Sequence, residues 1–318
     1  MSKKNKLLFA YLGVMISLTF VRICFNESWF GELDSTSSDR LFSTIVQIVC
    51  MGIIPLCAII LTDKKKKFGS VAKRIGYRPF QKGKTVWLVL ALSLLHVAIN
   101  GGVSTVWSAM VKATGYKSVV ADADYYPDFG AFLLGTFFSC VLPATFEELT
   151  HRSLAIEMTD GSFVKKVIVT SALFALMHQN ILQTGYTFVG GLMFGAITVI
   201  TGSIFPAMIM HFINNFFVCV RVYSTSINGI IASCVDWFYS FCSTWWGMAV
   251  ATVLWFGCVV LAVYFFKLLY GQNKDRIIQK KSEILTKSEK ILSVFLWIAI
   301  FVIGISTTLY SYIWGLMR

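Results

Sequence analysis

Long runs of apolar residues, separated by short polar connections, follow one another along the whole chain. Such runs can be marked at about 7–25, 41–62, 86–111, 130–156, 164–180, 184–201, 203–222, 244–267 and 291–316. Most approach the roughly 20 residues that an α-helix needs to cross a bilayer, and they lack the alternation of transmembrane β-strands. The pattern predicts an all-α, polytopic membrane helix bundle of eight or nine transmembrane helices, forming a single transmembrane domain over 1–318.

Composition agrees with a protein whose solvent is lipid. Hydrophobic residues make up 56% of the chain and charged residues only 14%, with a mean hydropathy of +0.70. A soluble domain is usually about a quarter charged, so water is a poor solvent for this surface.

The net charge of +12 is concentrated in short tracts beside the apolar runs. Because basic connections stay on the cytoplasmic side of a membrane, we expect the N-terminus and the connections 63–85 and 268–290 to be cytoplasmic. The acidic connections 26–40 and 112–129 are then external, as is the C-terminus. No basic fold module accompanies the charge, which argues against nucleic acid as a partner and for the lipid bilayer. Without organelle-targeting signals, the expected location is a bacterial plasma membrane, as a multi-pass protein.

Two local patterns predict structural roles. The external segment 223–243 is rich in aromatic residues but too interrupted to span, which is typical of an interfacial helix. Gly191 and Gly195 are spaced four residues apart, a pattern that allows two membrane helices to pack closely.

Two adjacent carboxylates, Glu147 and Glu148, lie well inside a predicted span. By the helical rise, Glu147 lies roughly 15 Å from the inner end of that span. Charged groups at such depth are costly and usually functional. Glu148 and Arg152 are four residues apart, so they share a helix face and can form an ion pair, which leaves Glu147 to face another direction.

Two of the four histidines, His178 and His211, fall in later spans at a similar predicted depth. His211 shares a helix face with Asn215, four residues on. A lone histidine in a membrane span usually has a packing role. Two histidines at the same depth as a carboxylate instead favour a common site.

Such a group of residues suits the activation of water. A carboxylate and a neutral imidazole can hold a water and take its proton, and a second histidine with an asparagine amide can bind the resulting oxyanion. Two histidines and a glutamate can also ligate Zn²⁺, but the chain has no HExxH motif. We therefore expect no metal ligands and no cofactor, with zinc as the alternative.

These segments resemble the CAAX prenyl protease and bacteriocin-processing family of intramembrane proteases, also called CPBP or Abi. That family carries the motifs EExxxR, FxxxH and HxxxN in this order. The chain matches them with Glu147, Glu148 and Arg152, then Phe174 and His178, then His211 and Asn215. The resemblance covers about 130–220, which we expect to be the catalytic core.

The resemblance implies an intramembrane endopeptidase that acts without a metal. Glu147 and His178 are implied to activate water, His211 and Asn215 to bind the oxyanion, and Glu148 and Arg152 to hold the geometry. Its substrate would be a membrane peptide or a lipid-anchored protein, in peptide maturation or bacteriocin self-immunity.

Two residues of the first motif differ from that family. His151 replaces its usual aromatic residue, and Ser153 replaces its usual glycine. His151 follows Glu147 by four residues, so a contact between them is expected to alter the activity.

Two other function classes compete with proteolysis. A non-catalytic scaffold or immunity protein would use the same fold to bind a peptide or a sensor partner. A transporter would use the buried carboxylates as proton relays, but the chain lacks a convincing inverted repeat.

Overall fold

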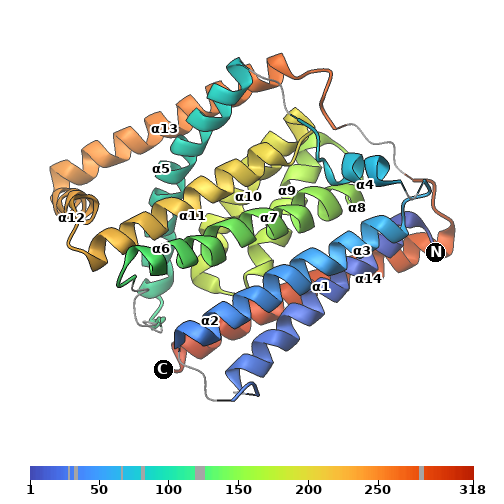
Figure 1. Cartoon of the computed structure of the whole chain (residues 1–318), viewed down its shortest axis with the longest axis horizontal. Coiled ribbons are helices and arrows are strands. Elements are labelled where there is room, and N and C mark those ends of the chain that lie inside the picture. The colour runs from blue at the N-terminus through green and yellow to red at the C-terminus, as the bar shows by residue number, and fades with distance from the viewer. Residues whose placement is uncertain (28, 32–34, 66, 80–82, 119–125, 279–282) are drawn as a thin grey trace.

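The computed structural model describes residues 1–27, 29–31, 35–65, 67–79, 83–118, 126–278 and 283–318. Within these ranges every regular element is a helix, and long helices lie side by side across the molecule (Figure 1). Several charged residues used above to assign the connections lie outside the described residues: Glu32, Asp34, Lys66, Asp122 and Asp124.

Eight helical segments in the described chain are long and apolar enough to cross a membrane. The predicted all-α polytopic bundle is therefore confirmed. Six are single helices: α1 (Lys3–Asn26), α5 (Lys84–Ala113), α10 (Ile181–Thr201), α11 (Phe205–Ser226), α13 (Trp245–Gln272) and α14 (Lys287–Leu316). One of the other two joins α2 (Ser35–Thr44), the π-helix η1 (Ile45–Ile53) and α3 (Ile54–Leu61). The last joins α6 (Phe129–Thr136), the π-helix η2 (Phe137–Val141), α7 (Leu142–Glu148), the π-helix η3 (Leu149–Ala155) and α8 (Ile156–Met158).

Three shorter helices complete the described fold. The fifth apolar run, 164–180, forms α9 (Phe163–Met177), whose 15 residues fall short of a full membrane crossing. The aromatic segment predicted to be external forms α12 (Ile230–Cys242), which Figure 1 shows almost end-on beside long helices that lie in the plane of the view. This crosswise orientation is that expected of an interfacial helix. The third, α4 (Phe68–Ile75), follows the basic connection after α3.

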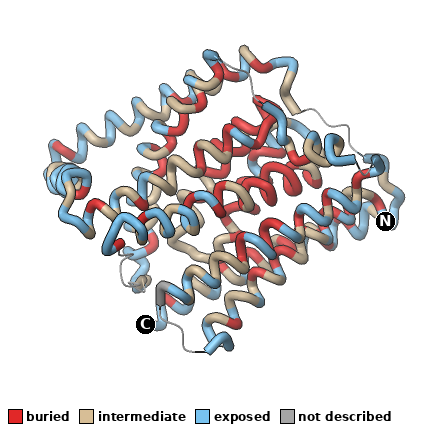
Figure 2. The backbone as a smooth tube through the Cα atoms, in the orientation of Figure 1, coloured by how far each residue is buried: buried red, intermediate tan, exposed pale blue. Residues whose placement is uncertain are grey.

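Burial separates a central group of helices from a peripheral one. Figure 2 shows buried residues gathered along α7, α9, α10 and the adjoining part of α11, whereas α13 carries few. In the most apolar stretch of α10, 61% of residues are buried, against 6% in α13. Because α13 is nevertheless strongly apolar, its uncovered face is suited to lipid.

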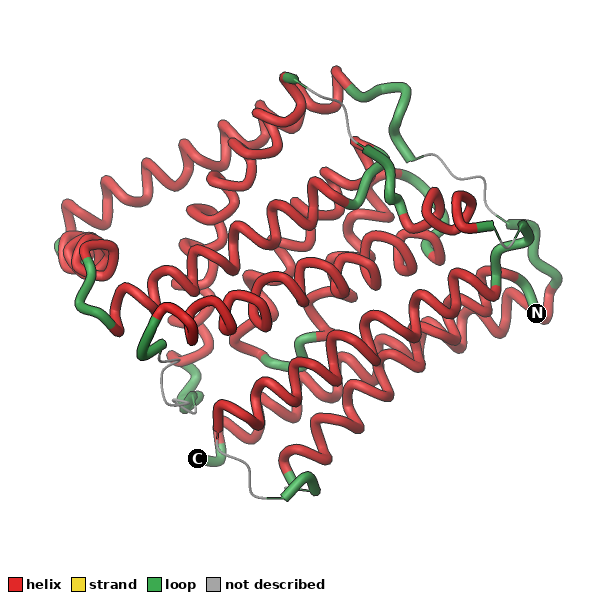
Figure 3. Tube along the Cα trace, in the orientation of Figure 1, coloured by secondary structure: helices red, strands yellow, loops and turns green. Residues whose placement is uncertain are grey.

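The connections gather at two opposite ends of the bundle (Figure 3). Contacts at one end join the N-terminus to the basic connections: the backbone amides of Lys3 and Lys4 donate to Glu283, and Arg276 donates to the carbonyl of Pro79. The basic connections thus share one end with the N-terminus, as the predicted topology requires. That this end is cytoplasmic stays a prediction.

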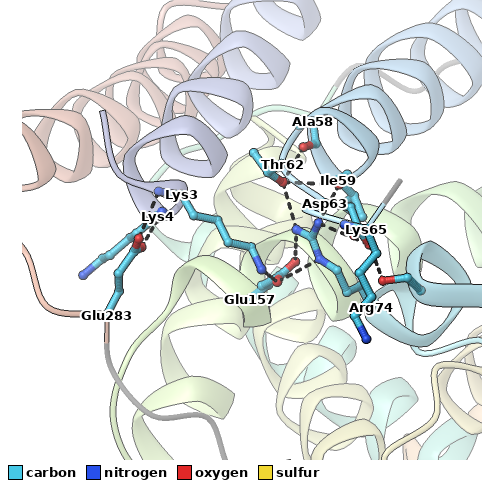
Figure 4. A network of polar contacts seen from close by, with 11 residues as sticks. Lys3, Lys4, Ala58, Ile59, Thr62, Asp63, Lys65, Arg74, Glu157 and Glu283 are labelled. Atoms are coloured by element: carbon cyan, nitrogen blue, oxygen red, sulfur yellow. Dashed lines mark hydrogen bonds and ion pairs between the residues drawn. The ribbon is translucent and has the colours of Figure 1, made fainter. Parts of the chain in front are cut away.

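Arg74 on α4 ties several helices together at this end (Figure 4). Its guanidinium donates to both carboxylate oxygens of Glu157, at 3.1 and 2.9 Å. It also donates to the carbonyl of Ile59, in the last turn of α3, at 2.7 Å. Lys3 from α1 also pairs with Glu157, at 2.7 Å. Bidentate pairing gives this contact a fixed geometry, so α1, α3 and α4 are held against the inner end of the glutamate-bearing span.

The turn between α9 and α10 has irregular backbone, yet its polar groups find partners. Arg22 donates to the carbonyl of His178, Trp107 donates to that of Ile181, and Ser311 accepts from the amide of Ile181. Irregular backbone inside a membrane protein is stable only where protein satisfies it in this way. The turn is therefore fixed by α1, α5 and α14, and it fixes His178 in turn.

Close packing of α9 against α10 confirms the predicted role of the two glycines. A β-carbon on Gly191 would lie 2.9 Å from the Cα of Ser171, and one on Gly195 would be in ordinary contact with Val167 and Thr170. The backbones approach because no side chain stands between them at Gly191.

We expect Gly191→Ala to lower stability, because the new methyl group forces the two helices apart. Overpacking of this kind costs about 1–3 kcal/mol. The midpoint of thermal unfolding in detergent measures the effect, with Gly257→Ala as control, since a β-carbon there meets nothing within 4 Å. Equal midpoints for both variants and the parent would contradict the packing described.

Candidate active site

Two of the π-helical segments border the glutamate pair. η2 precedes it and is followed by Pro143, and η3 begins directly after Glu148. Proline lacks an N–H and crowds the carbonyl four residues earlier, so a wider turn ahead of it is physically reasonable. Such turns rotate the side chains that follow, and they are frequent at functional sites.

Glu148 lies at the centre of a buried ionic chain. Its Oε2 pairs with Nε of Arg152 at 3.0 Å, and its Oε1 accepts from Nδ1 of His211 at 2.9 Å. The side chains of Glu148 and Arg152 have no solvent exposure, and that of His211 has 6%. The ion pair predicted from the four-residue spacing is therefore formed, and it extends to α11.

Two phenylalanine rings form the apolar surface under this chain. The Arg152 guanidinium lies 5.0 Å from the ring centre of Phe174 and 5.5 Å from that of Phe194. Its two terminal nitrogens have no hydrogen-bond partner among the described residues. The faces of the two rings therefore provide the remaining electrostatic stabilisation of the cation.

All four histidines of the chain pack around the same two rings. Phe174 makes edge contacts with His151, His178 and His211, with ring centres 5.1, 4.9 and 5.9 Å apart. Phe194 stacks on His211 at 5.1 Å and makes an edge contact with His96 at 4.9 Å. The structure thus brings His178 and His211 to one place, as the sequence predicts.

Hydrogen bonds to the main chain fix the tautomer of His178. Its Nδ1 lies 2.8 Å from the carbonyl oxygen of Phe174. A carbonyl can only accept, so Nδ1 carries a proton and, in a neutral ring, Nε2 is an acceptor. His178 also interacts electrostatically with Glu147. An acceptor at Nε2 is the property required of a group that binds a water.

Glu147 divides its two oxygens between different partners. Oε1 accepts from Nε2 of Gln47 at 2.7 Å, whereas Oε2 lies 4.0 Å from Nε2 of His211. That separation is too long for a direct hydrogen bond and is of the kind that a water bridges. The side chain is 9% exposed, so a carboxylate is present in a largely dry environment.

Asn215 lies one helical turn beyond His211 and contacts η2. Its amide donates to the carbonyl of Ser139 at 3.0 Å, and its Oδ1 accepts from Asn214 at 3.1 Å. Asn214 in turn accepts from Asn100 on α5. One N–H of the Asn215 amide therefore bonds to the main chain of the glutamate-bearing span, and the other N–H remains available as a donor.

The two unusual residues of the first motif both have structural contacts. His151 donates from Nδ1 to the main-chain carbonyl of Glu147, at 2.8 Å, and accepts at Nε2 from the hydroxyl of Tyr11, at 3.0 Å. Ser153 donates to the carbonyl of Ile75, at the end of α4. The expected contact of His151 with Glu147 exists, but it involves the backbone of Glu147.

Three residues of this site were not predicted from the sequence: Tyr11, Gln47 and His96. Each is polar within an apolar span, and that alone was a usable signal. All three are buried, at 0%, 6% and 0% exposure. Their role in the site depends on which spans pack together, which hydropathy does not reveal.

No group of three or more His, Cys, Asp or Glu side chains in the described part of the chain is arranged to hold a metal ion. Glu148 and His211 are already joined to each other, with Arg152 on the far side of the carboxylate.

Comparison with protein families supports the resemblance seen in the motifs. Residues 129–217 match the model of the Rce1-like type II CAAX prenyl endopeptidases. This segment contains the glutamate pair, His178, His211 and Asn215. That about 130–220 forms the catalytic core stays a prediction. No curated protein and no solved structure matches the chain.

Removal of the guanidinium should be strongly destabilising. Arg152→Ala removes the guanidinium partner of the buried Glu148 carboxylate, a loss of about 3–5 kcal/mol in unfolding free energy. Adding Glu148→Gln removes the stranded charge and should restore much of that loss.

Thermal unfolding of the two single variants and the double variant in detergent measures this coupling. If the destabilisations of the single variants simply add in the double variant, the ionic chain does not have the described role.

Proposed function

We propose that the protein is an intramembrane endopeptidase in which Glu147 activates a water for attack on a peptide bond. The observation that carries this proposal is the arrangement of acceptors. Gln47 occupies Glu147 Oε1 and the carbonyl of Phe174 occupies His178 Nδ1, which leaves Glu147 Oε2 and His178 Nε2 as the atoms that can accept from a water. The match of 129–217 to a family of prenyl endopeptidases supports the same reaction class.

The first step transfers a proton from water to Glu147. One hydrogen of the water is donated to Glu147 Oε2 and the other to His178 Nε2, which leaves an oxygen lone pair for the carbonyl carbon. As the new C–O bond forms, Glu147 takes the first proton. When the C–N bond breaks, the protonated Glu147 returns this proton to the leaving nitrogen.

The oxyanion of the tetrahedral intermediate requires hydrogen-bond donors. Because Nδ1 of His211 donates to Glu148, Nε2 carries a hydrogen only in the imidazolium form. The Glu148 carboxylate stabilises that positive charge as the aspartate of a catalytic triad does. We assign the oxyanion contact to Nε2–H of this imidazolium, together with the second N–H of Asn215.

Charge balance supports the imidazolium form. Glu147, Glu148 and Arg152 together carry a net charge of −1 in a buried environment. A protonated His211 brings the four groups to neutrality, which removes the cost of an uncompensated buried charge. When water transfers its proton to Glu147, the four side chains together carry +1 and the oxyanion carries −1, so the site with its bound intermediate stays neutral.

The proposed substrate is a membrane-associated peptide or a lipid-anchored protein, because the site lies among membrane-spanning helices. The proposed hydrolysis is glutamate-based and uses no metal or other cofactor. The proposed role is in peptide maturation or bacteriocin self-immunity, and the proposed location is a bacterial plasma membrane. The eight long apolar helical segments in the described part of the chain show its multi-pass character.

Replacement of Glu147 by glutamine tests the chemistry. The protein in proteoliposomes is given two fluorogenic peptides, one ending in a prenylated cysteine followed by three residues and one without the prenyl group. We expect cleavage by the parent and a fall of about 10²–10⁴-fold in Glu147→Gln, since the general base is lost while the side-chain shape is retained.

Glu27→Gln is the matched control, because Glu27 is exposed at the external end of α1. It should cleave at the parent rate. Glu147→Gln cleaving both peptides as fast as the parent would refute the proposal, as would intact cellular function of a Glu147→Ala, His178→Ala double variant. The latter result would indicate a non-catalytic binding protein.

A further inference from the structure

Gln47 contacts the proposed base from outside the segment that matches the family model. It lies on η1, in the span that ends at Leu61, and is separated from Glu147 by 100 positions. Its side chain is 6% exposed, and its Nε2 donates to Glu147 Oε1 at 2.7 Å. A charge-assisted hydrogen bond of this length is among the stronger ones in proteins.

The span that carries Gln47 is fastened to the glutamate-bearing span on both sides of this contact. Ser43 donates to the carbonyl of Phe138 at 3.3 Å, and Thr150 donates to the carbonyl of Met51 at 2.8 Å. Gly52 leaves room for the ring of Phe146, which would lie 2.8 Å from a β-carbon there. The amide of Gln47 is therefore presented to Glu147 by a fixed backbone.

A glutamine amide can serve a carboxyl group in both of its protonation states. Its N–H donates to the carboxylate, and after rotation of the amide its carbonyl oxygen can accept from the carboxylic acid. In the structure this carbonyl oxygen is buried without a hydrogen-bond partner among the described residues. Glu147 alternates between the two states in the proposed reaction, so the same side chain can hold it throughout.

We infer that Gln47 is a positioning residue, which holds Glu147 by Oε1 so that Oε2 is directed to His211 and the reacting water. This role rests on the proposed function, but the contact itself does not. Without the amide, the carboxylate can rotate and its charged form loses a donor, so its acceptor oxygen is no longer fixed.

Other charged or titratable groups also act on Glu147, and they remain in any Gln47 variant. His211 lies at 4.0 Å, and His178, Arg152 and Tyr186 interact with it electrostatically from α9, η3 and α10. Because Gln47 is uncharged, its removal changes hydrogen bonding without changing this charge pattern.

Infrared spectroscopy tests the contact without requiring activity. The difference between the parent and Glu147→Gln isolates the carboxyl bands of Glu147 in protein reconstituted in lipid. In Gln47→Met, which keeps length and removes the amide, the carboxylate band should move from its parental position. Thr44→Val is the control, since the Thr44 hydroxyl donates to the carbonyl of Arg40 in its own helix and has no other hydrogen bond within the described part of the chain. It should leave the band unchanged. An unmoved band in Gln47→Met would overturn the inference.

Gln47→Asn provides a second variant if the methionine variant does not fold. Its amide is shorter by one methylene and should also displace the band. An unmoved band in this folded variant would likewise overturn the inference.

Peptide cleavage then distinguishes positioning from mere packing. In Gln47→Met we expect kcat to fall about tenfold with KM unchanged, as loss of a hydrogen bond that fixes the reacting carboxylate implies. A rise in KM with an unchanged kcat would contradict the positioning role. If the parent cleaves neither peptide, the proposed function fails, while the infrared result still decides whether Gln47 holds Glu147.

Discussion

The buried carboxylate of Glu148 is the constraint on which the rest of the site depends. A charged group buried inside a helix bundle is stable only when it has a partner of opposite charge and its remaining lone pairs accept hydrogen bonds. Arg152 and His211 provide these partners at 3.0 and 2.9 Å. Because the partners come from η3 and α11, satisfying Glu148 also fixes the orientation of His211. Glu147, adjacent in the chain, is outside this ion pair, with its Oε2 4.0 Å from the other nitrogen of His211. It is therefore left available for chemistry.

The membrane environment explains why so many irregular features surround this site. Main-chain groups without helical partners cannot be left facing lipid, so the turn after α9 is closed by Arg22, Trp107 and Ser311. The same requirement places His178 on a rigid support, since its ring is bonded to the carbonyl of Phe174. The cation of Arg152 is accommodated by aromatic faces, and the rings that do this also contact the histidines. Stability and the geometry of the site therefore depend on the same few side chains.

Features that depend on local spacing could be predicted from the sequence. Apolar runs located the long helices to within a few residues, and the spacing of Glu148 and Arg152 predicted their ion pair. The convergence of His178 and His211 followed from their similar depth. Gln47 and Tyr11 escaped prediction because their contacts join spans that are 100 and 140 positions apart. Hydropathy identifies such spans but does not say which of them are neighbours, or which side of each faces the site.

The catalytic roles of the site residues, unlike their positions, follow from chemistry and stay a prediction. Their central claim is that Glu147 and His178 share one water. A cryo-electron microscopy map of the protein in lipid nanodiscs, at a resolution that shows ordered waters, tests this most directly. We expect a water within hydrogen-bond distance of both Glu147 Oε2 and His178 Nε2, with His211 facing the same space. A map in which apolar side chains fill the space between these two atoms and exclude water would contradict it.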